Sequence, residues 1–164
     1  MERLFVVALG EADGDPMRLT PHGRHQMVRM GLSLYPMLKG HRVRLTTGDL
    51  RWMREASEQV GQGLKIVPDS HRSMRCEGDP RRDAIAIMGG LRRSSEPVTA
   101  VVALLASEHA TALMRYAYSQ YTQGQGRNWP PVVAAGDAVV LDFNWGSRCE
   151  VLGALPPHKE SRAG

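Results

Sequence analysis

Hydrophobic residues follow two different spacings along this 164-residue chain. Short continuous apolar runs, the first at residues 4–9 and the strongest at residues 98–105, are typical of strands that are buried on both faces of a parallel sheet. Longer segments repeat an apolar residue every three or four positions, which is typical of amphipathic helices. Because the two kinds of segment alternate, they predict an α/β protein with right-handed crossovers between parallel strands.

Four helices are predicted from their start signals and apolar stripes. Thr20 before Pro21, and Asp79 before Pro80, combine a capping side chain with a proline at the first helical position. Pro36 is expected to kink or shorten the last turn of the first helix. The residues predicted to face the core are Met27, Met30, Leu34 and Leu38 in the first helix, Met53, Ala56, Val60 and Leu64 in the second, Ile85, Met88 and Leu91 in the third, and Ala110, Leu113, Ala117 and Tyr121 in the fourth.

Strands are predicted at residues 4–9, 42–46, 65–67, 98–105, 137–143 and 149–155, with loops by composition at residues 12–18 and 69–77. The short link between the last two strands predicts an antiparallel hairpin. The predicted architecture is a three-layer sandwich, in which helices flank a mostly parallel central sheet with this hairpin at its edge. The length fits a single domain, residues 1–156, followed by a polar tail, residues 157–164.

The charge of the chain narrows the range of partners. The net charge is +4 and 18 of the 21 basic residues are arginine, but these are spread along the chain without a block of like charges. With 5% aromatic residues, this composition argues against a nucleic-acid partner. Arginine forks suit phosphate or carboxylate groups, although a codon bias toward arginine is the simpler explanation. The arginines at positions 72, 75, 81, 82, 92 and 93 are interleaved with Asp69, Glu77, Asp79 and Asp83, and we interpret them as a solvated mixed-charge face rather than a binding patch.

The sequence predicts no cofactor, metal site or membrane segment. Cys76 and Cys149 are the only cysteines, and they form no CxxC or Cys/His spacing that would hold a metal. Whether they ever pair in a disulfide stays open. The apolar run near the N-terminus is too short for a signal peptide, and no run approaches about 18 apolar residues. We therefore expect a cytoplasmic protein, whose oligomeric state the sequence leaves open.

Three junctions that follow predicted strands are expected to carry any chemistry: residues 8–11, 47–52 and 106–109. The carboxyl ends of parallel strands meet at one edge of a sheet, and open α/β sheets bind their ligands there. The side chains at this edge with acid–base or metal-binding chemistry are Glu11, Glu108 and His109.

Motifs at these junctions occur in a familiar order. The first strand ends in Ala8-Leu9-Gly10-Glu11, residues 19–26 read LTPHGRHQ, and the fourth predicted helix opens on Ser107-Glu108-His109. A Gly-Asp pair, a Val-Val-Leu-Asp strand and a tryptophan follow within residues 136–145. In this order the chain resembles the histidine phosphatases, which include the phosphoglycerate mutases, and it is most similar to the short phosphohistidine phosphatase type. The second motif matches the family pattern Leu-Thr-x-x-Gly-x-x-Gln in full.

The residues that carry the family's chemistry are the ones that differ. In the family the first motif reads Arg-His-Gly-Glu; its histidine is the phosphorylated nucleophile, and two arginines and a second histidine hold the phosphoryl group. The resemblance puts Leu9 at the nucleophile, Ala8 and Trp52 at the arginines, and Glu108 at the second histidine. Leucine has no lone pair to attack phosphorus, and the lost cations no longer stabilise phosphoryl transfer. At Glu108 a like charge about 4 Å from phosphate would repel it by roughly 4 kcal/mol at an effective dielectric constant of about 20.

Two hypotheses from different classes follow. In the first, the chain is a pseudophosphatase of the phosphoglycerate mutase-like fold, and it binds or regulates an unidentified protein or small-molecule ligand. In the second, it is a divergent hydrolase of a phosphorylated protein or small molecule, with His109, Glu108 and Glu11 in new catalytic or metal-binding roles. A shift of one residue in the alignment would put His109 at the second-histidine position. The degenerate pocket is expected at Ala8, Leu9, Gly10, Glu11, Trp52, Glu108 and His109, where the apolar members either plug the site or form a recognition surface.

Overall fold

The computed structural model describes residues 3–70, 74, 78–92, 99–121, 133–144 and 148–155. The strands are β1 (Arg3–Ala8), β2 (Ala12–Asp13), β3 (Arg18–Leu19), β4 (Val43–Thr47), β5 (Asp69–Ser70), β6 (Ala100–Leu105), β7 (Ala138–Asn144) and β8 (Arg148–Leu155). The helices are α1 (Pro21–Leu38), α2 (Arg51–Leu64), α3 (Pro80–Arg92) and α4 (Ser107–Tyr121). The predicted tail, Cys76 and the side chain of Cys149 lie outside the described residues.

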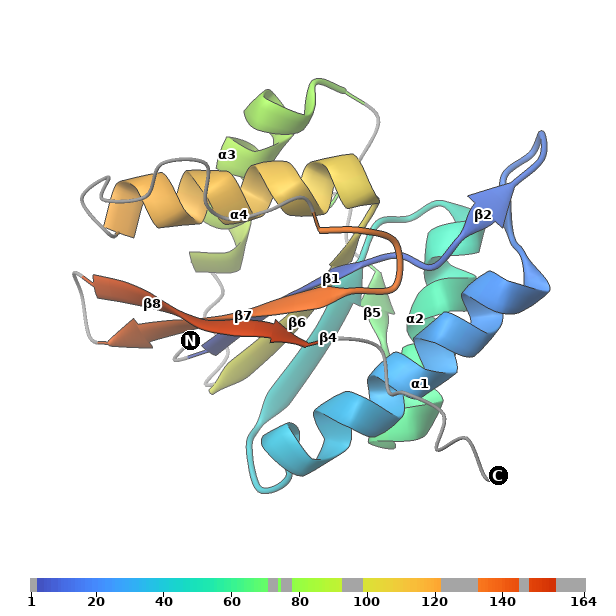
Figure 1. Ribbon diagram of the computed structural model, residues 1–164, viewed down its shortest axis with the longest axis horizontal. Coiled ribbons are helices and arrows are strands. Elements are labelled where there is room, and N and C mark those ends of the chain that lie inside the picture. The colour runs from blue at the N-terminus through green and yellow to red at the C-terminus, as the bar shows by residue number, and fades with distance from the viewer. Residues whose placement is uncertain are drawn as a thin grey trace, which may run out of the picture.

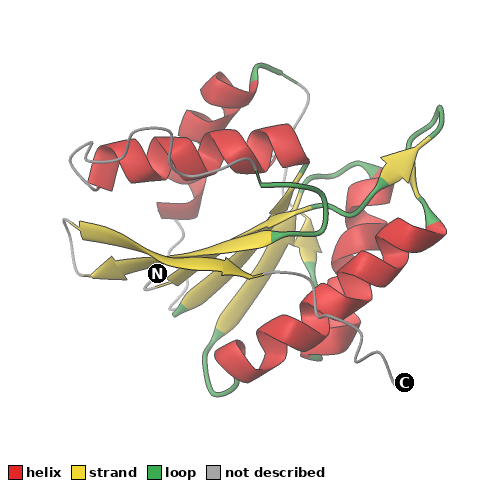
Figure 2. Cartoon of the chain, viewed as in Figure 1, coloured by secondary structure: helices red, strands yellow, loops and turns green. Residues whose placement is uncertain are grey.

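The central sheet has six strands in the order β5-β4-β6-β1-β7-β8 (Figure 1). Strands β5, β4, β6 and β1 pair in parallel, whereas β7 pairs antiparallel with β1 and forms a hairpin with β8 at the edge. Helices α3 and α4 cover one face of the sheet and α1 and α2 the other, which makes three layers (Figure 2). The predicted mostly parallel sandwich with an antiparallel edge hairpin is confirmed.

Alternation along β1 divides the hydrophobic core in two. Phe5, Val7 and Leu9 join the cluster under α1 and α2, whereas Val6 and Ala8 join the cluster under α3 and α4. All five are at most 2% exposed, as expected for a strand with helices on both faces. Successive residues of β1 therefore serve different faces, and the same alternation continues into the loop at its carboxyl end.

The predicted helix signals are confirmed at α1 and α2. Thr20 accepts a hydrogen bond on its side chain from the Gly23 amide (2.9 Å), and Pro21 takes the first helical position. The four core positions predicted in each of these helices are buried. No described helix has the length and apolar character needed to cross a membrane.

The strand predicted at residues 65–67 is wrong. Lys65 has a left-handed backbone (φ 56°) that ends α2, and the amides of Lys65 and Ile66 donate to carbonyls of its last turn. Pro68 has no N–H to donate, so pairing with β4 begins only at Asp69. Since Asp69 and the next residue form β5, the start of the loop predicted at residues 69–77 is also wrong.

Two smaller predictions change as well, and the kinked or shortened last turn at Pro36 stays a prediction. The loop predicted at residues 12–18 contains the short antiparallel ladder of β2 and β3. Helix α1 continues past Pro36 and ends at Leu38. In α3, Ile85 is 54% exposed, and Ile87, which is 1% exposed, packs in the core instead. At this position the core-facing residue of α3 is therefore Ile87 and not the predicted Ile85.

Candidate functional site

The three predicted junctions meet at the carboxyl edge of the sheet. Ala8 pairs with Leu105 at the ends of β1 and β6, and Thr47 pairs with Leu104 at the end of β4. Beyond the ladder, the Leu9 amide donates to the Leu105 carbonyl (2.8 Å) and the Thr47 hydroxyl donates to the Leu104 carbonyl (3.1 Å). The edge predicted to hold the site is therefore assembled from residues 8–11, 47–52 and 106–109.

Two glycines let the first junction pack directly on the start of α1. A Cβ on Gly10 would overlap the Gly23 carbonyl, and a Cβ on Gly23 would overlap the Glu11 carbonyl. The Thr20 amide donates to the same Glu11 carbonyl at 3.0 Å. Both glycines are thus required by a close backbone approach, which any side chain would block.

Gln26 of α1 connects this junction to the loop before β7. Its Oε1 accepts from the Glu11 amide at 2.9 Å, and its Nε2 donates to the Ala135 carbonyl at 3.3 Å. The Gly136 amide donates to the Ala8 carbonyl (3.1 Å), which fixes the same loop against the end of β1. One side-chain amide therefore holds two loops that are more than 100 residues apart in sequence.

The α4 junction holds the loop before β7 from the other side. The Ser107 hydroxyl donates to the Val133 carbonyl. The Thr111 hydroxyl donates to the Ser107 carbonyl (2.9 Å) and accepts from the Val133 amide (3.0 Å). Nearby, burial raises the pKa of the Asp137 carboxyl above its ordinary value, because desolvation disfavours the charged form.

Apolar residues occupy the positions that the resemblance gives to the nucleophile and the two arginines. Leu9 is 2% exposed and belongs to the cluster that also holds Leu19 and Met53. Trp52, at the start of α2, is partly buried against that same cluster. Ala8 is fully buried in the other cluster, under α3 and α4. Hydrocarbon therefore fills this part of the edge on both faces of the sheet.

The acid–base candidates do not gather into one cluster. Glu11 and Glu108 are both exposed, and Glu108 lies in the first turn of α4. His109 is 5% exposed, and its Nε2 lies 2.9 Å from Oδ2 of Asp83 in α3. Because a carboxylate only accepts, this contact places the proton on Nε2. Among the described residues, no three His, Cys, Asp or Glu side chains gather as a metal site would require.

Asp83 is a partner that the sequence patterns did not identify as such. It accepts from His109 and, through the same oxygen, from the Gly78 amide at 3.0 Å. The two side chains are 26 residues apart on different helices, so no local spacing relates them. The one signal for Asp83 was its place in the first turn of α3, where an acid favours the helix dipole.

Comparisons with known proteins bear on the fold. The sequence matches no protein-family model, and no curated protein matches it. Among solved structures, a proposed phosphohistidine phosphatase SixA from Nakamurella multipartitia aligns with a TM-score of 0.75 at 14% identity, covering 96% of this chain and 97% of that one. The protein histidine phosphatase SixA complexed with tungstate aligns with a TM-score of 0.74 at 16% identity, covering 94% and 97%.

A mycobacterial phosphatase is also similar. The mycobacterial glucosyl-3-phosphoglycerate phosphatase aligns with a TM-score of 0.67 at 14% identity, covering 92% of this chain and 97% of that one. These alignments span nearly the full length of both partners, and all three neighbours are phosphatases or proposed phosphatases by name. The chain therefore has the phosphoglycerate mutase-like fold of the histidine phosphatases.

Proposed function

We propose that this protein is a histidine phosphatase-like chain without phosphatase activity, which acts by binding or by regulating a partner. The observation that carries the proposal is Leu9. It stands where the fold's relatives are expected to hold the nucleophile, it is 2% exposed, and it packs in the core. Covalent phosphoryl transfer needs a nucleophile with a lone pair, and leucine has none.

The surroundings of Leu9 support the same conclusion. Trp52 and Ala8 supply hydrocarbon where two cations would stabilise a phosphoryl group, and such charge stabilisation is the largest part of phosphoryl-transfer catalysis. Glu108 adds a carboxylate at the fourth position. These four positions would offer a phosphate ester no fixed positive charge. They would offer it one negative charge, from Glu108.

Retention of the supporting residues argues against simple loss of the site. Gly10, Gly23 and Gln26 still hold the first junction and the loop before β7 in place, and Ser107 still holds that loop from α4. The supporting contacts of the edge are therefore kept while the four reactive positions have changed. This combination supports a binding or regulatory role on an intact scaffold.

The alternative is a divergent hydrolase that uses His109, Glu108 and Glu11. The contact of His109 with Asp83 is the observation that favours it, because His–Asp pairs orient general bases in many hydrolases. His109, however, is 5% exposed, and its Nε2–H donates a hydrogen bond to Asp83. Glu11 and Glu108 are exposed, and within the described part of the chain neither side chain bonds to His109 or to the other glutamate. A base that substrate cannot reach does not abstract its proton, so this geometry disfavours the alternative.

The first test is an activity assay of the purified chain on p-nitrophenyl phosphate and on a phosphohistidine-bearing protein. We expect no turnover above the buffer rate with either substrate. His109→Ala serves as the diagnostic variant. Turnover by the native chain that disappears in His109→Ala would refute the proposal and establish the alternative.

The second test restores the lost groups. The combined substitutions Ala8→Arg, Leu9→His, Trp52→Arg and Glu108→His are expected to create tungstate binding that the native chain lacks, measured by calorimetry. A matched variant keeps Leu9 and carries the other three substitutions. It separates the effect of the restored charges from that of the restored histidine, and it should bind tungstate more weakly than the fourfold variant. Tungstate binding by the native chain, competed by phosphate, would contradict a degenerate anion site.

A further inference from the structure

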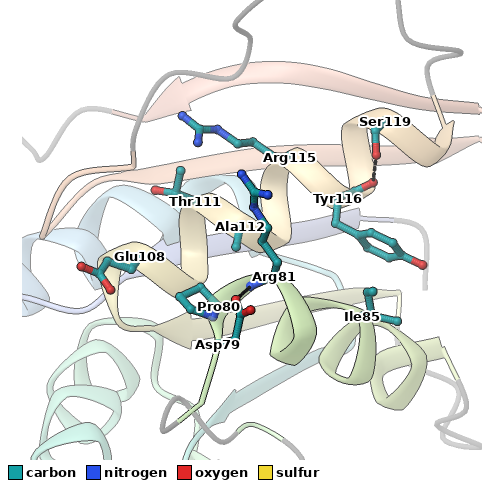
Figure 3. A pocket seen from close by; sticks show the side chains of 10 residues that line it. All are labelled: Asp79, Pro80, Arg81, Ile85, Glu108, Thr111, Ala112, Arg115, Tyr116 and Ser119. Carbon is teal, nitrogen blue, oxygen red and sulfur yellow. Dashed lines mark hydrogen bonds between the residues drawn. The ribbon is translucent and has the colours of Figure 1, made fainter.

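A second candidate binding site lies on the outer side of the α3/α4 layer. A groove of about 520 Å³ runs between the start of α3 and the exposed face of α4 (Figure 3). This volume is within the range of roughly 300–1,000 Å³ that is typical of small-molecule sites. The groove is separate from the core around Leu9, and Glu108 is the lining residue that it shares with the degenerate pocket.

One end of the groove is apolar and accessible. Ile85 of α3 is 54% exposed there, although its spacing predicted a core position. Ala112 and Tyr116 of α4 line the same stretch, and in Figure 3 the Tyr116 ring points away from the Glu108 end and toward the side on which Ile85 lies. An exposed isoleucine beside an aromatic ring provides an apolar wall that a ligand would cover.

Two arginines line the middle of the groove, one from each helix. In Figure 3, Arg81 reaches from α3 toward α4, and Arg115 extends along α4 toward its N-terminal end. Among the described residues, neither guanidinium group has a carboxylate partner, in contrast to Arg24, which pairs with Glu55 at 2.8 Å. Two guanidinium groups at one groove, neither of them in an ion pair with a described carboxylate, favour the binding of an anion.

Two carboxylates, Asp79 and Glu108, also line the groove, but neither forms an ion pair with these arginines. Asp79 Oδ1 accepts from the Arg81 amide at 3.0 Å and so caps the start of α3. The Thr111 hydroxyl is used within α4 and the loop before β7. Glu108 lies at the N-terminal end of α4 and points away from both arginines in Figure 3.

From this arrangement we propose that the groove binds a small organic anion, with a phosphate or carboxylate head and an aromatic or aliphatic body. The head lies at Arg81 and Arg115, and the body covers Ile85 and Tyr116. Glu108 repels the head from the far end and so fixes the orientation of the ligand. Glu108 is the one lining residue that also belongs to the degenerate pocket, and the proposed binding does not depend on whether that pocket is inactive.

The test is an NMR titration of the ¹⁵N-labelled full chain with phenylphosphonate, which no phosphatase activity can hydrolyse, and in a parallel arm with benzoate. We expect saturable shifts of amides in residues 79–85 and 108–119, with a Kd of about 1 mM for a probe of this size. The arm that binds more tightly identifies the preferred head. Inorganic phosphate and benzyl alcohol, which each carry half of the proposed chemistry, should bind at least about fivefold more weakly.

Variants assign the binding to the groove. Arg81→Ala and Arg115→Ala should each raise the Kd by about tenfold, and Ile85→Ala by about threefold. The matched control is Arg82→Ala, an exposed arginine of the same helix that does not line the groove, with a change below about twofold. Shifts centred on residues 8–11 and 52, an equal loss in Arg82→Ala, or no saturation up to about 20 mM would each overturn the proposal.

Discussion

At the residue scale, the contact between His109 and Asp83 joins α4 to α3 and occupies one ring nitrogen of the histidine. The side chain is 5% exposed, and its Nε2 contacts a carboxylate of the neighbouring helix at 2.9 Å. A histidine at the adjacent position would point elsewhere, because successive residues of a helix are about 100° apart around its axis. An alignment shifted by one residue would therefore select a side chain that is almost fully buried and already contacts Asp83.

The pair is expected to stabilise the packing of α3 on α4. Asp83→Ala should lower the free energy of unfolding by roughly 1–3 kcal/mol, because it leaves the buried His109 N–H without an acceptor. Urea denaturation of Asp83→Ala, His109→Ala and the double variant would form a double-mutant cycle with a coupling of about 1 kcal/mol or more. Arg82→Ala, an exposed change on the same helix, should cost less than about 0.5 kcal/mol. Additive single effects would show that the contact contributes nothing.

At the element scale, the contact between the first junction and α1 depends on missing side chains. Gly23 lies in the first turn of α1, where its Cα faces the Glu11 carbonyl, and Gly10 faces the Gly23 carbonyl in return. Gln26, one turn later, uses both ends of its amide on the two loops. Helix α1 therefore positions the edge of the sheet through backbone contact and one side chain.

Gly23→Ala is expected to destabilise the chain although alanine is the better helix former. The new Cβ would overlap the Glu11 carbonyl, so the junction must move, at a cost of roughly 1–3 kcal/mol against a propensity gain of about 1 kcal/mol. Thermal denaturation shows whether the substitution lowers or raises the Tm. Leu32→Ala, which is on the same helix and 54% exposed in the native chain, is the control, with little change. A rise in Tm for Gly23→Ala would contradict the close approach.

The elements that were predicted correctly are those in which the spacing of apolar residues allows only one assignment. The stripes of α1 and α2 and the apolar runs of β1 and β6 left no competing assignment. The strand predicted at residues 65–67 is wrong because Lys65 has a left-handed backbone and forms the C-terminal cap of α2. The amino-acid composition of this segment does not reveal such a cap. The prediction that Ile85 faces the core is wrong because α3 carries apolar residues on more than one face. Only tertiary packing decides whether Ile85 or Ile87 is buried.

In the candidate site, too, some features could be predicted from the sequence and others could not. Which strand ends meet follows from parallel pairing, so the three junctions could be placed from sequence. The pairing of His109 with Asp83 and the groove at Arg81 and Arg115 could not, because they depend on how α3 and α4 pack. Contacts between two helices that are separated by a strand carry no local sequence signal.

At the scale of the whole molecule, the place of the expected nucleophile has become part of the core. A buried cationic and imidazole cluster is costly to keep in a fold, since polar groups in an apolar setting must find partners. Leu9 instead contributes to the hydrophobic cluster under α1 and α2, together with Leu19 and Met53. Activity sites are often kept at the expense of stability, so a chain that has lost the activity can gain stability at the same position.

This exchange gives a prediction for Leu9 itself. Leu9→Ala should lower the free energy of unfolding by roughly 2–4 kcal/mol, as for other fully buried leucines, because it removes contacts and leaves a cavity. Leu9→His, the change needed to restore a nucleophile, should also cost roughly 1–3 kcal/mol, because it puts a polar ring among hydrocarbon groups. Urea denaturation measures both, with Leu32→Ala as the exposed-leucine control at about 0.5 kcal/mol or less. If Leu9→His left the free energy of unfolding unchanged, the position would still be a tolerant pocket, and the site would be a dormant active site rather than core.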